Sequence, residues 1–244
     1  MDEHSLHSPF IFGFYREVIR QDRSVPLFSG IEKLRDSLLQ SSKEINVQDM
    51  GAGSAVTLGV KRKVSDIAKY GLAPAKNSRL YYRIIESIAA ETVLELGTSF
   101  GINSMYIAAP TCVKKLVTFE GCPKIAEIAK ANFTGFSSAK IQLINEPIDQ
   151  KLELTLNRLG TIDLVLFDAN HTYEATMRYY RQCKPFINEH SILIFDDIHW
   201  SKGMSKAWQE IQKEVDITLT IDLFDLGIVF FKKDLEKEDY ILKW

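Results

Sequence analysis

The sequence predicts an α/β fold, in which a seven-stranded, mostly parallel sheet ends in an antiparallel hairpin and follows a helical N-terminal cap. From residue 91 onward, short apolar runs alternate with amphipathic segments, which is typical of parallel strands covered by helices on both faces. The last two apolar runs are separated only by Phe224 and Asp225, too few residues for a helical crossover between parallel strands.

Seven strands and five intervening helices follow from this alternation. We expect the strands at residues 92–96, 115–119, 140–144, 162–167, 191–195, 216–223 and 226–232. We expect the helices between the first six strands at residues 101–109, 123–133, 148–158, 172–187 and 201–213. The charged tail from residue 232 to 244 is expected to be mostly solvated.

Four further helices are expected before the first strand, at residues 10–20, 29–40, 64–70 and 78–89. Ser8-Pro9 suits a helix start, because serine caps helices and proline is tolerated at the first helical position. The segment 44–63 gives no clear pattern. We therefore predict a helical cap or lid over residues 1–77, placed over the substrate side, and one α/β domain over residues 78–244.

Composition narrows the class of protein. The chain has 244 residues, 45% of them hydrophobic, which is enough for a core. With a net charge of -2 and a pI near 6.2, nucleic acid is not an expected partner. No apolar run reaches the ~18 residues that span a bilayer, and the N-terminus has no signal-peptide pattern. Three cysteines without a CxxC pair fit reduced thiols, so we expect a cytoplasmic protein.

The most informative motif is VLELGTSFG at residues 93–101, followed by the apolar run 117–119 and Glu120. It predicts a strand, a glycine turn, a helix and a second strand that ends in a carboxylate. Such a unit suits a nucleoside cofactor, because glycines let the backbone approach the ligand and the acid accepts hydrogen bonds from ribose hydroxyls. With only Gly97 and Gly101, the loop is not the GxGxxG dinucleotide pattern.

A second glycine-rich segment, DMGAGS at residues 49–54, also has the composition of a cofactor loop. No strand with a terminal acid follows it at the right distance, and the basic run 61–63 interrupts the pattern. We therefore interpret this segment as a plain turn, or as a lid or substrate-side loop, rather than as the main cofactor loop.

Carboxylates follow two of the later apolar runs. Asp168 ends the run 164–167, and Asp196 and Asp197 end the run 192–195. Ligands bind at the carboxyl ends of the strands in open α/β sheets, where converging carboxylates repel each other unless a positive charge lies between them. We expect these three aspartates to bind Mg²⁺ or another divalent cation. Solvated loop acids or helix caps are the alternative interpretation.

The E-L-G-x-x-x-G loop with Glu120 resembles the cofactor site of class I S-adenosylmethionine-dependent methyltransferases, which have a Rossmann-like fold. The resemblance implies S-adenosylmethionine as the cofactor and residues 78–244 as the methyltransferase domain. It implies that Glu95 orients the ammonium group of the cofactor and that Glu120 holds the ribose hydroxyls. The implied cofactor-binding residues are Glu95, Gly97, Thr98, Ser99, Gly101, Ile102, Asn103, Glu120, Asn145, Glu146 and Asp168.

Residues 75–200 further resemble the bacterial O-methyltransferases that are similar to catechol O-methyltransferase. This resemblance implies cation-assisted O-methylation of a small hydroxylated acceptor, with Asp168 and His171 as catalytic residues. His171 stands where the animal enzyme has its general-base lysine, and imidazole suits proton transfer near neutral pH. A local hydrogen bond at a helix start is the alternative for His171. The pair Asp196-Asp197 departs from the Asp-Asn pair of the animal enzyme by one negative charge.

Other functions fit parts of the pattern. A metal-independent methyltransferase acting on nitrogen or on a macromolecule would share the glycine loop without needing the three aspartates. A non-catalytic cofactor-binding protein would keep the loop, but its acids would not converge. The missing third glycine disfavours a nicotinamide oxidoreductase. We expect a small-molecule acceptor and no membrane partner, and a homodimer through the N-terminal helices stays open.

Overall fold

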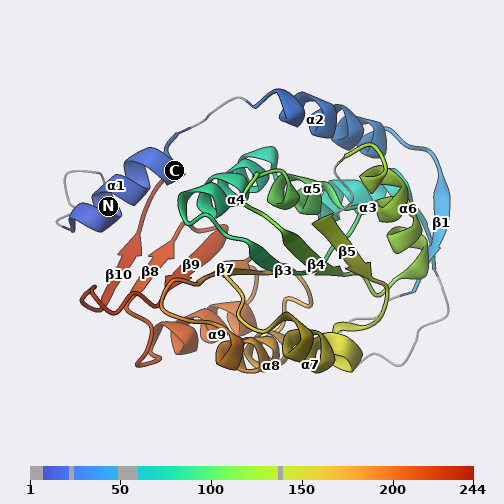
Figure 1. Ribbon diagram of the computed structural model, residues 1–244. Coiled ribbons are helices and arrows are strands. Elements are labelled where there is room, and N and C mark those ends of the chain that lie inside the picture. The colour runs from blue at the N-terminus through green and yellow to red at the C-terminus, as the bar shows by residue number, and fades with distance from the viewer. Residues whose placement is uncertain (1–7, 22–24, 49–59, 137–139) are drawn as a thin grey trace. The chain divides into compact units, whose positions relative to one another are not determined.

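The computed structural model describes residues 8–21, 25–48, 60–136 and 140–244 (Figure 1). The chain divides into two compact units. Residues 22–151 form the first, here called the glycine-loop unit, and residues 1–21 with 152–244 form the second, the aspartate unit. Each unit is described by itself.

The glycine-loop unit contains three parallel strands in the order β3-β4-β5. They span Thr92–Leu96, Lys115–Phe119 and Ile141–Ile144, and the bounds of β3 and β4 are those predicted. Helix α5 (Ile102–Ala108) leads from β3 to β4, and helix α6 (Pro123–Phe133) leads from β4 to β5. The predicted β-turn-α-β unit is therefore present around the glycine loop.

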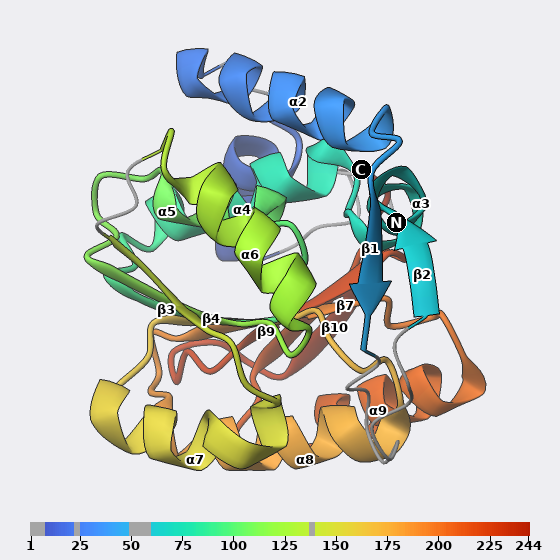
Figure 2. The same cartoon turned by 90° about the vertical axis from the view of Figure 1, so that its right-hand side faces the viewer.

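Three helices precede β3 in this unit: α2 (Pro26–Leu39), α3 (Val64–Gly71) and α4 (Ala75–Ser87) (Figure 2). Helix α2 begins three residues earlier than predicted because Pro26 stands in its first turn, a position that proline favours. Helices α2, α3, α5 and α6 share one apolar cluster, which includes Phe28, Ile31, Leu38, Val64, Ala68, Met105 and Phe133.

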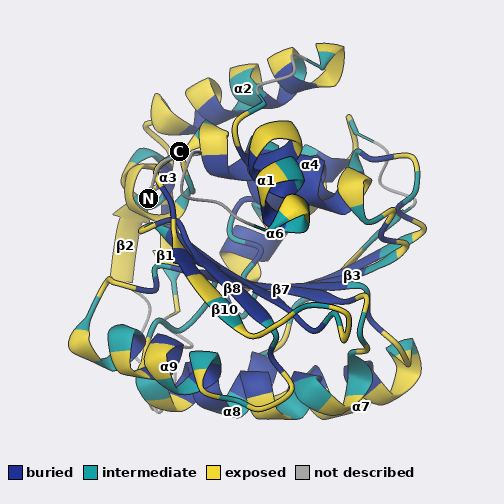
Figure 3. Cartoon of the chain, turned by 90° about the vertical axis from the view of Figure 1, so that its left-hand side faces the viewer, coloured by how far each residue is buried: buried dark blue, intermediate teal, exposed yellow. Residues whose placement is uncertain are grey.

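Two strands in the segment without a clear pattern form an antiparallel pair, β1 (Glu44–Val47) with β2 (Val60–Lys63). Ile45 is buried in the apolar cluster, whereas every residue of β2 is exposed (Figure 3). The charged side chains of residues 61–63 discourage further pairing along this edge. The glycine-rich segment 49–54 lies outside the described residues, so its interpretation stays a prediction.

The aspartate unit contains five strands in the order β10-β8-β9-β7-β6. Strands β6 (Leu164–Phe167) and β7 (Ile192–Asp196) are parallel. Strands β8 (Leu219–Asp222) and β9 (Leu226–Phe230) form the predicted antiparallel hairpin, and β9 also pairs antiparallel with β7. The carboxyl ends of β6, β7 and β8 therefore meet at one edge of this sheet.

The prediction that the charged tail is mostly solvated is wrong. Residues Glu238–Ile241 form β10, parallel to β8, and Tyr240 and Leu242 are buried. Among the described residues, β3 to β10 give eight strands, one more than the predicted seven. The tail is part of the sheet because two apolar side chains among its charges pack inward, a pattern too short for the sequence to signal.

The first helix belongs to the aspartate unit. Helix α1 (Pro9–Phe14) continues as a π-helical turn at Tyr15–Ile19. The rings of Phe10 and Phe14 pack edge-on against Phe230 of β9, and the Tyr15 hydroxyl donates to the Lys243 carbonyl at 2.7 Å. The segment 1–77 thus contributes to both units and includes strands as well as helices. Its placement over the substrate side stays a prediction.

Three longer helices complete the chain. Helix α7 (Ile148–Leu159) crosses the boundary between the units, and α8 (Tyr173–Cys183) and α9 (Lys202–Gln212) belong to the aspartate unit. Thr172 caps α8 by accepting the Ala175 N–H, so Asp168 is not the cap of this helix. Within the described ranges, no helix combines the length and apolar character needed to cross a membrane.

Candidate active site

The glycine loop leaves β3 with three residues in the left-handed region: Gly97 at φ 114°, Ser99 at φ 48° and Gly101 at φ 82°. The Thr98 N–H donates to the Phe119 carbonyl at 2.8 Å, and the Gly101 N–H donates to the Thr98 carbonyl at 2.9 Å. A serine at positive φ is uncommon and costs roughly 1–3 kcal/mol. The loop is therefore held in a shape that the local sequence does not favour by itself.

Gly101 is required for a packing reason as well. A Cβ atom added there would lie 2.4 Å from the nearest ring carbon of Phe133 on α6, well inside van der Waals contact. The sequence offers two reasons for this glycine, the approach of a ligand and close packing of a helix against a strand. The structure shows that the closest approach on this side comes from the Phe133 ring, a contact between residues 32 positions apart that no local pattern reveals.

Glu120 follows β4 and closes the glycine loop from the second strand. The Ser99 N–H donates to Oε2 of Glu120 at 3.0 Å, and the Cys122 N–H donates to Oε1 at 2.8 Å. Burial raises the pKa of Glu120 to about 7, while the two N–H donors act in the opposite direction. Each carboxylate oxygen keeps acceptor capacity beyond its one N–H bond, as recognition of a ribose diol requires.

Glu95 lies on β3, fully buried. Its Oε2 accepts hydrogen bonds from the hydroxyls of Ser104 and Thr118, while its Oε1 has no partner among the described residues. Burial raises the pKa of Glu95 to about 7. A buried acid with one unsatisfied oxygen is costly in a folded protein, and a cationic ligand group is one way to relieve that cost.

The other predicted cofactor residues of this unit differ in their surroundings. Ile102 is part of the apolar cluster, and Asn103 is buried, with Oδ1 accepting from the Ser78 hydroxyl at 2.6 Å. The amide of Asn145 donates to the Glu120 carbonyl at 2.7 Å, and Glu146 is exposed. Asn145 therefore supports the backbone of Glu120, the acid that is predicted to hold the ribose.

The predicted aspartates gather in the other unit, after β6 and at the end of β7. Asp196 is buried, and its side chain shares a hydrogen bond with Asp168. Burial, together with repulsion from Asp197, raises the pKa of Asp196 to about 7. Asp197 is held at φ 55°, and its N–H donates to the Asp225 carbonyl at 2.8 Å.

His171 lies between two of these acids. Its Nε2 is 3.7 Å from Oδ1 of Asp168 and 3.8 Å from Oδ2 of Asp197, beyond hydrogen-bond distance. This buried nitrogen has no hydrogen-bond partner among the described residues. Burial lowers the pKa of His171, and Asp197 acts in the opposite direction. The helix-start hydrogen bond, which was the alternative interpretation of His171, is not formed by Nε2.

A family described as a methyltransferase domain matches residues 94–198, the stretch from β3 through the Asp196-Asp197 pair. By this match, residues 94–198 are similar to a methyltransferase domain. The predicted methyltransferase identity is confirmed by this match. A comparison with curated proteins gave no match.

Solved structures share the fold of this methyltransferase. The O-methyltransferase TomG from Streptomyces achromogenes, in complex with SAM, has a TM-score of 0.56 at 17% identity, covering 66% of this chain and 82% of TomG. The O-methyltransferase from Bacillus cereus, in complex with SAH, has a TM-score of 0.56 at 14% identity, covering 66% and 83%. Cofactor-bound Rv0187 from MTB has a TM-score of 0.60 at 17% identity, covering 94% and 100%.

The residues of the predicted cation site have suitable donor atoms for a divalent cation, but their side chains are not arranged as a set of ligands. Within the described part of the chain, no three His, Cys, Asp or Glu side chains are placed as a set of metal ligands. The donors themselves are carboxylate oxygens, which hard divalent cations prefer. Asp168 and Asp196 share a hydrogen bond where a cation could replace the proton, and the Asp197 side chain, 43% exposed, has room to turn.

Sequence reasoning missed a second imidazole–carboxylate pair in the methyltransferase. Nε2 of His199 lies 2.8 Å from Oδ2 of Asp222, a buried residue at the end of β8. Oδ1 of Asp222 accepts the N–H of Phe224, which is held at φ 72° in the hairpin turn. The two partners are 23 residues apart, so only the pairing of β8 with β9 and of β9 with β7 could reveal the contact.

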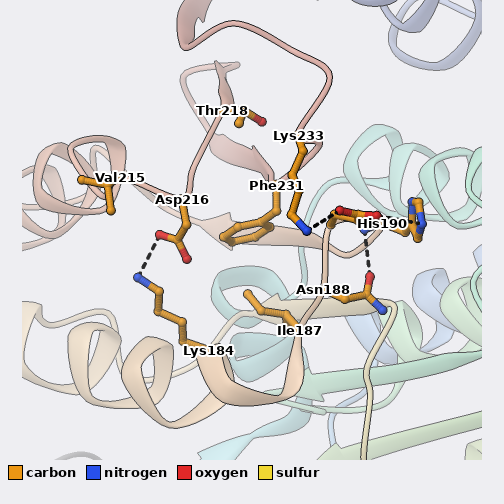
Figure 4. A pocket seen from close by; sticks show the side chains of 10 residues that line it. Lys184, Ile187, Asn188, His190, Val215, Asp216, Thr218, Phe231 and Lys233 are labelled. Atoms are coloured by element: carbon orange, nitrogen blue, oxygen red, sulfur yellow. Dashed lines mark hydrogen bonds and ion pairs between the residues drawn. The ribbon is translucent and has the colours of Figure 1, made fainter.

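A separate pocket lies at the opposite edge of the aspartate unit. It has a volume of about 740 Å³ and is lined by residues that precede β7 and β8 and follow β9 (Figure 4). Its cations are neutralised, since Lys184 lies 2.9 Å from Asp216 and Lys233 lies 2.8 Å from Glu189. None of the predicted site residues lines this pocket, so it does not serve as the candidate active site.

The raised pKa values of Glu95 and Glu120 predict a falling free energy of unfolding as pH rises. From pH 4.5 to about 7, the folded state holds these protons while the unfolded chain releases them, so stability declines through this window and then levels. Between pH 5 and pH 8, the free energy of unfolding of the wild type should fall by on the order of 2–3 kcal/mol more than that of the Glu120→Gln variant. Chemical denaturation at pH 5, 6, 7 and 8 measures the difference, and parallel profiles would contradict the assignment.

Proposed function

We propose that this methyltransferase moves the methyl group of S-adenosylmethionine to a hydroxyl oxygen of a small acceptor, with a divalent cation held by Asp168, Asp196 and Asp197. The observation that carries the proposal is the position of His171, whose unpartnered Nε2 lies between Asp168 and Asp197 at the carboxyl end of the sheet. The O-methyltransferases with the same fold support oxygen as the methyl acceptor.

The glycine loop and its acids bind the cofactor in this proposal. Glu120 accepts hydrogen bonds from the ribose hydroxyls with the acceptor capacity that its two N–H partners leave. Glu95 faces the ammonium group through Oε1, which has no partner among the described residues. Gly97, Thr98 and Ser99 supply backbone close to the methionine part, in a turn where Gly97 and Ser99 have positive φ.

Methyl transfer then needs alignment and removal of one proton. The acceptor oxygen attacks the methyl carbon in line with the sulfur, the carbon–sulfur bond breaks, and S-adenosylhomocysteine leaves as a neutral thioether. The acceptor proton moves to Nε2 of His171, which burial keeps neutral near pH 7. A cation bound to the three aspartates would orient the hydroxyl and lower its pKa.

Cofactor binding is tested directly with S-adenosylhomocysteine. Glu120→Ala removes the ribose acceptor and should weaken binding by ~1–3 kcal/mol, as for a hydrogen bond to a charged group. Isothermal titration calorimetry measures the affinity. Glu127→Ala is the control, because this exposed residue of α6 forms an ion pair with the exposed Lys124. Equal affinity in wild type and Glu120→Ala would remove the cofactor assignment of this acid.

The cation is tested with a screen of small hydroxylated acceptors. With an acceptor identified, EDTA treatment should abolish most turnover and added Mg²⁺ should restore it. Asp168→Asn should weaken Mg²⁺ binding and lower activity while the melting temperature stays close to wild type, because loop-end acids contribute little to the core. Full turnover after exhaustive EDTA treatment would show that the metal half of the proposal is wrong and that the methyltransferase works without a cation.

A further inference from the structure

Arg35 of helix α2 is a buried cation that the proposed mechanism does not use. Its side chain is 9% exposed, and Nε lies 3.1 Å from the Glu32 carboxylate. Nη1 donates to the Ala73 carbonyl at 2.6 Å, and Nη2 donates to the Ser78 hydroxyl at 3.3 Å. Buried charges persist only when they are paired and hydrogen-bonded. This guanidinium therefore joins α2 to residues 73–78, the segment in which α4 begins.

Ser78 passes this constraint to the start of α5. An arginine has only donors, so the Ser78 oxygen must accept from Arg35, and its own proton is left for Asn103. The Ser78 hydroxyl donates to Oδ1 of Asn103 at 2.6 Å. This direction fixes which end of the amide faces Ser78, and the Nδ2 end must point the other way. Asn103 stands in the first turn of α5, two residues after Gly101.

The same helix α2 holds α5 at a second point. The Tyr106 hydroxyl donates to Oε1 of Glu32 at 2.6 Å, and Tyr106 lies one turn beyond Asn103 on α5. Glu32 is also the partner of Arg35. Two consecutive turns of α5 are therefore tied to one ion pair on α2, a helix placed beside α4, α5 and α6 (Figure 2). Fixing both turns fixes the rotation of α5 about its axis.

We propose that Arg35 is a positioning residue of the cofactor site, which acts through Ser78 to aim the Asn103 amide donor at the carboxylate of the cofactor's methionine part. The inference rests on the proposed use of S-adenosylmethionine. It gives α2 a defined role: the helix sets the orientation of one donor at the amino-acid end of the cofactor, and it does not contribute to the adenosine end, where Glu120 lies.

Two ligands distinguish the binding contribution of the amino-acid end of the cofactor from that of the adenosine end. S-adenosylhomocysteine carries the amino acid, and methylthioadenosine lacks it. Calorimetry on the full-length chain gives the ratio of the two affinities. Ser78→Ala and Arg35→Met should each lower the affinity for S-adenosylhomocysteine roughly 5- to 20-fold and leave that for methylthioadenosine unchanged. Because both act on one amide, the double variant should lose little more than either single variant.

Ile31→Val is the matched control, since Ile31 is fully buried on α2 and belongs to the apolar cluster. It should lower the melting temperature without changing the affinity ratio. If Arg35→Met does not fold, Ser78→Ala decides the matter alone, and Ser78→Thr, which keeps the hydroxyl, should restore the ratio. An unchanged ratio in Ser78→Ala would overturn the inference. A wild-type chain that binds neither ligand would instead overturn the proposed cofactor, and the inference with it.

Discussion

Replacing His171 with alanine is expected to lower turnover by roughly 100- to 10,000-fold, the range typical of a lost acid–base group. The side chain offers a buried Nε2 with no partner among the described residues, 3.7 Å from Asp168 and 3.8 Å from Asp197. Burial lowers its pKa, so the imidazole is neutral and able to accept a proton near pH 7. Initial rates with an acceptor found by screening measure the effect.

Two comparisons make this result specific. The affinity for S-adenosylhomocysteine should stay nearly unchanged, because the cofactor acids lie in the glycine-loop unit. His190→Ala should have wild-type turnover, since the His190 side chain is 79% exposed and lies in the separate pocket. If His171→Ala kept its full rate across neutral pH, the base would have to be sought elsewhere, and His199 with its partner Asp222 would be the next candidate.

Replacing Gly101 with alanine is expected to destabilise the fold by about 2–5 kcal/mol. The new Cβ would sit 2.4 Å from the Phe133 ring, and the residue would have to keep φ at 82°. Overpacking and a left-handed conformation each cost on the order of 1–3 kcal/mol. For a chain of this size, the melting temperature should fall by roughly 5–15 °C, which thermal denaturation followed by circular dichroism would measure.

The packing part of this effect can be isolated. Gly135→Ala is the control, because a Cβ there would meet nothing within 4 Å, and it should change the melting temperature little. Combining Gly101→Ala with Phe133→Leu should recover part of the lost stability, because a smaller, more adaptable side chain leaves room for the Cβ. If Gly101→Ala were as stable as Gly135→Ala, the close packing of the loop against α6 would be refuted.

The sequence by itself determined the strands around the glycine loop and their order along the chain. Strands β3 and β4 have the predicted bounds because each is a buried apolar run between polar turns, a pattern that a short window contains in full. The same holds for Glu120, Asp168 and the Asp196-Asp197 pair, since a polar residue that ends an apolar run stands at a strand tip wherever the strand lies in the sheet. The hairpin followed from the length of its linker alone.

The tertiary structure alone decided which side chains meet. Gly101 needs its missing Cβ because of Phe133, His199 is oriented by Asp222, and the Asn103 amide is directed through Ser78 by Arg35, 68 positions earlier in the chain. Strand β10 forms where the charged sequence predicted a solvated tail, because Tyr240 and Leu242 are buried and the strand pairs with β8 at the edge of the sheet. Periodicity and composition report what a segment can bury, whereas these contacts depend on which distant segment arrives beside it, and only packing of the whole unit fixes that.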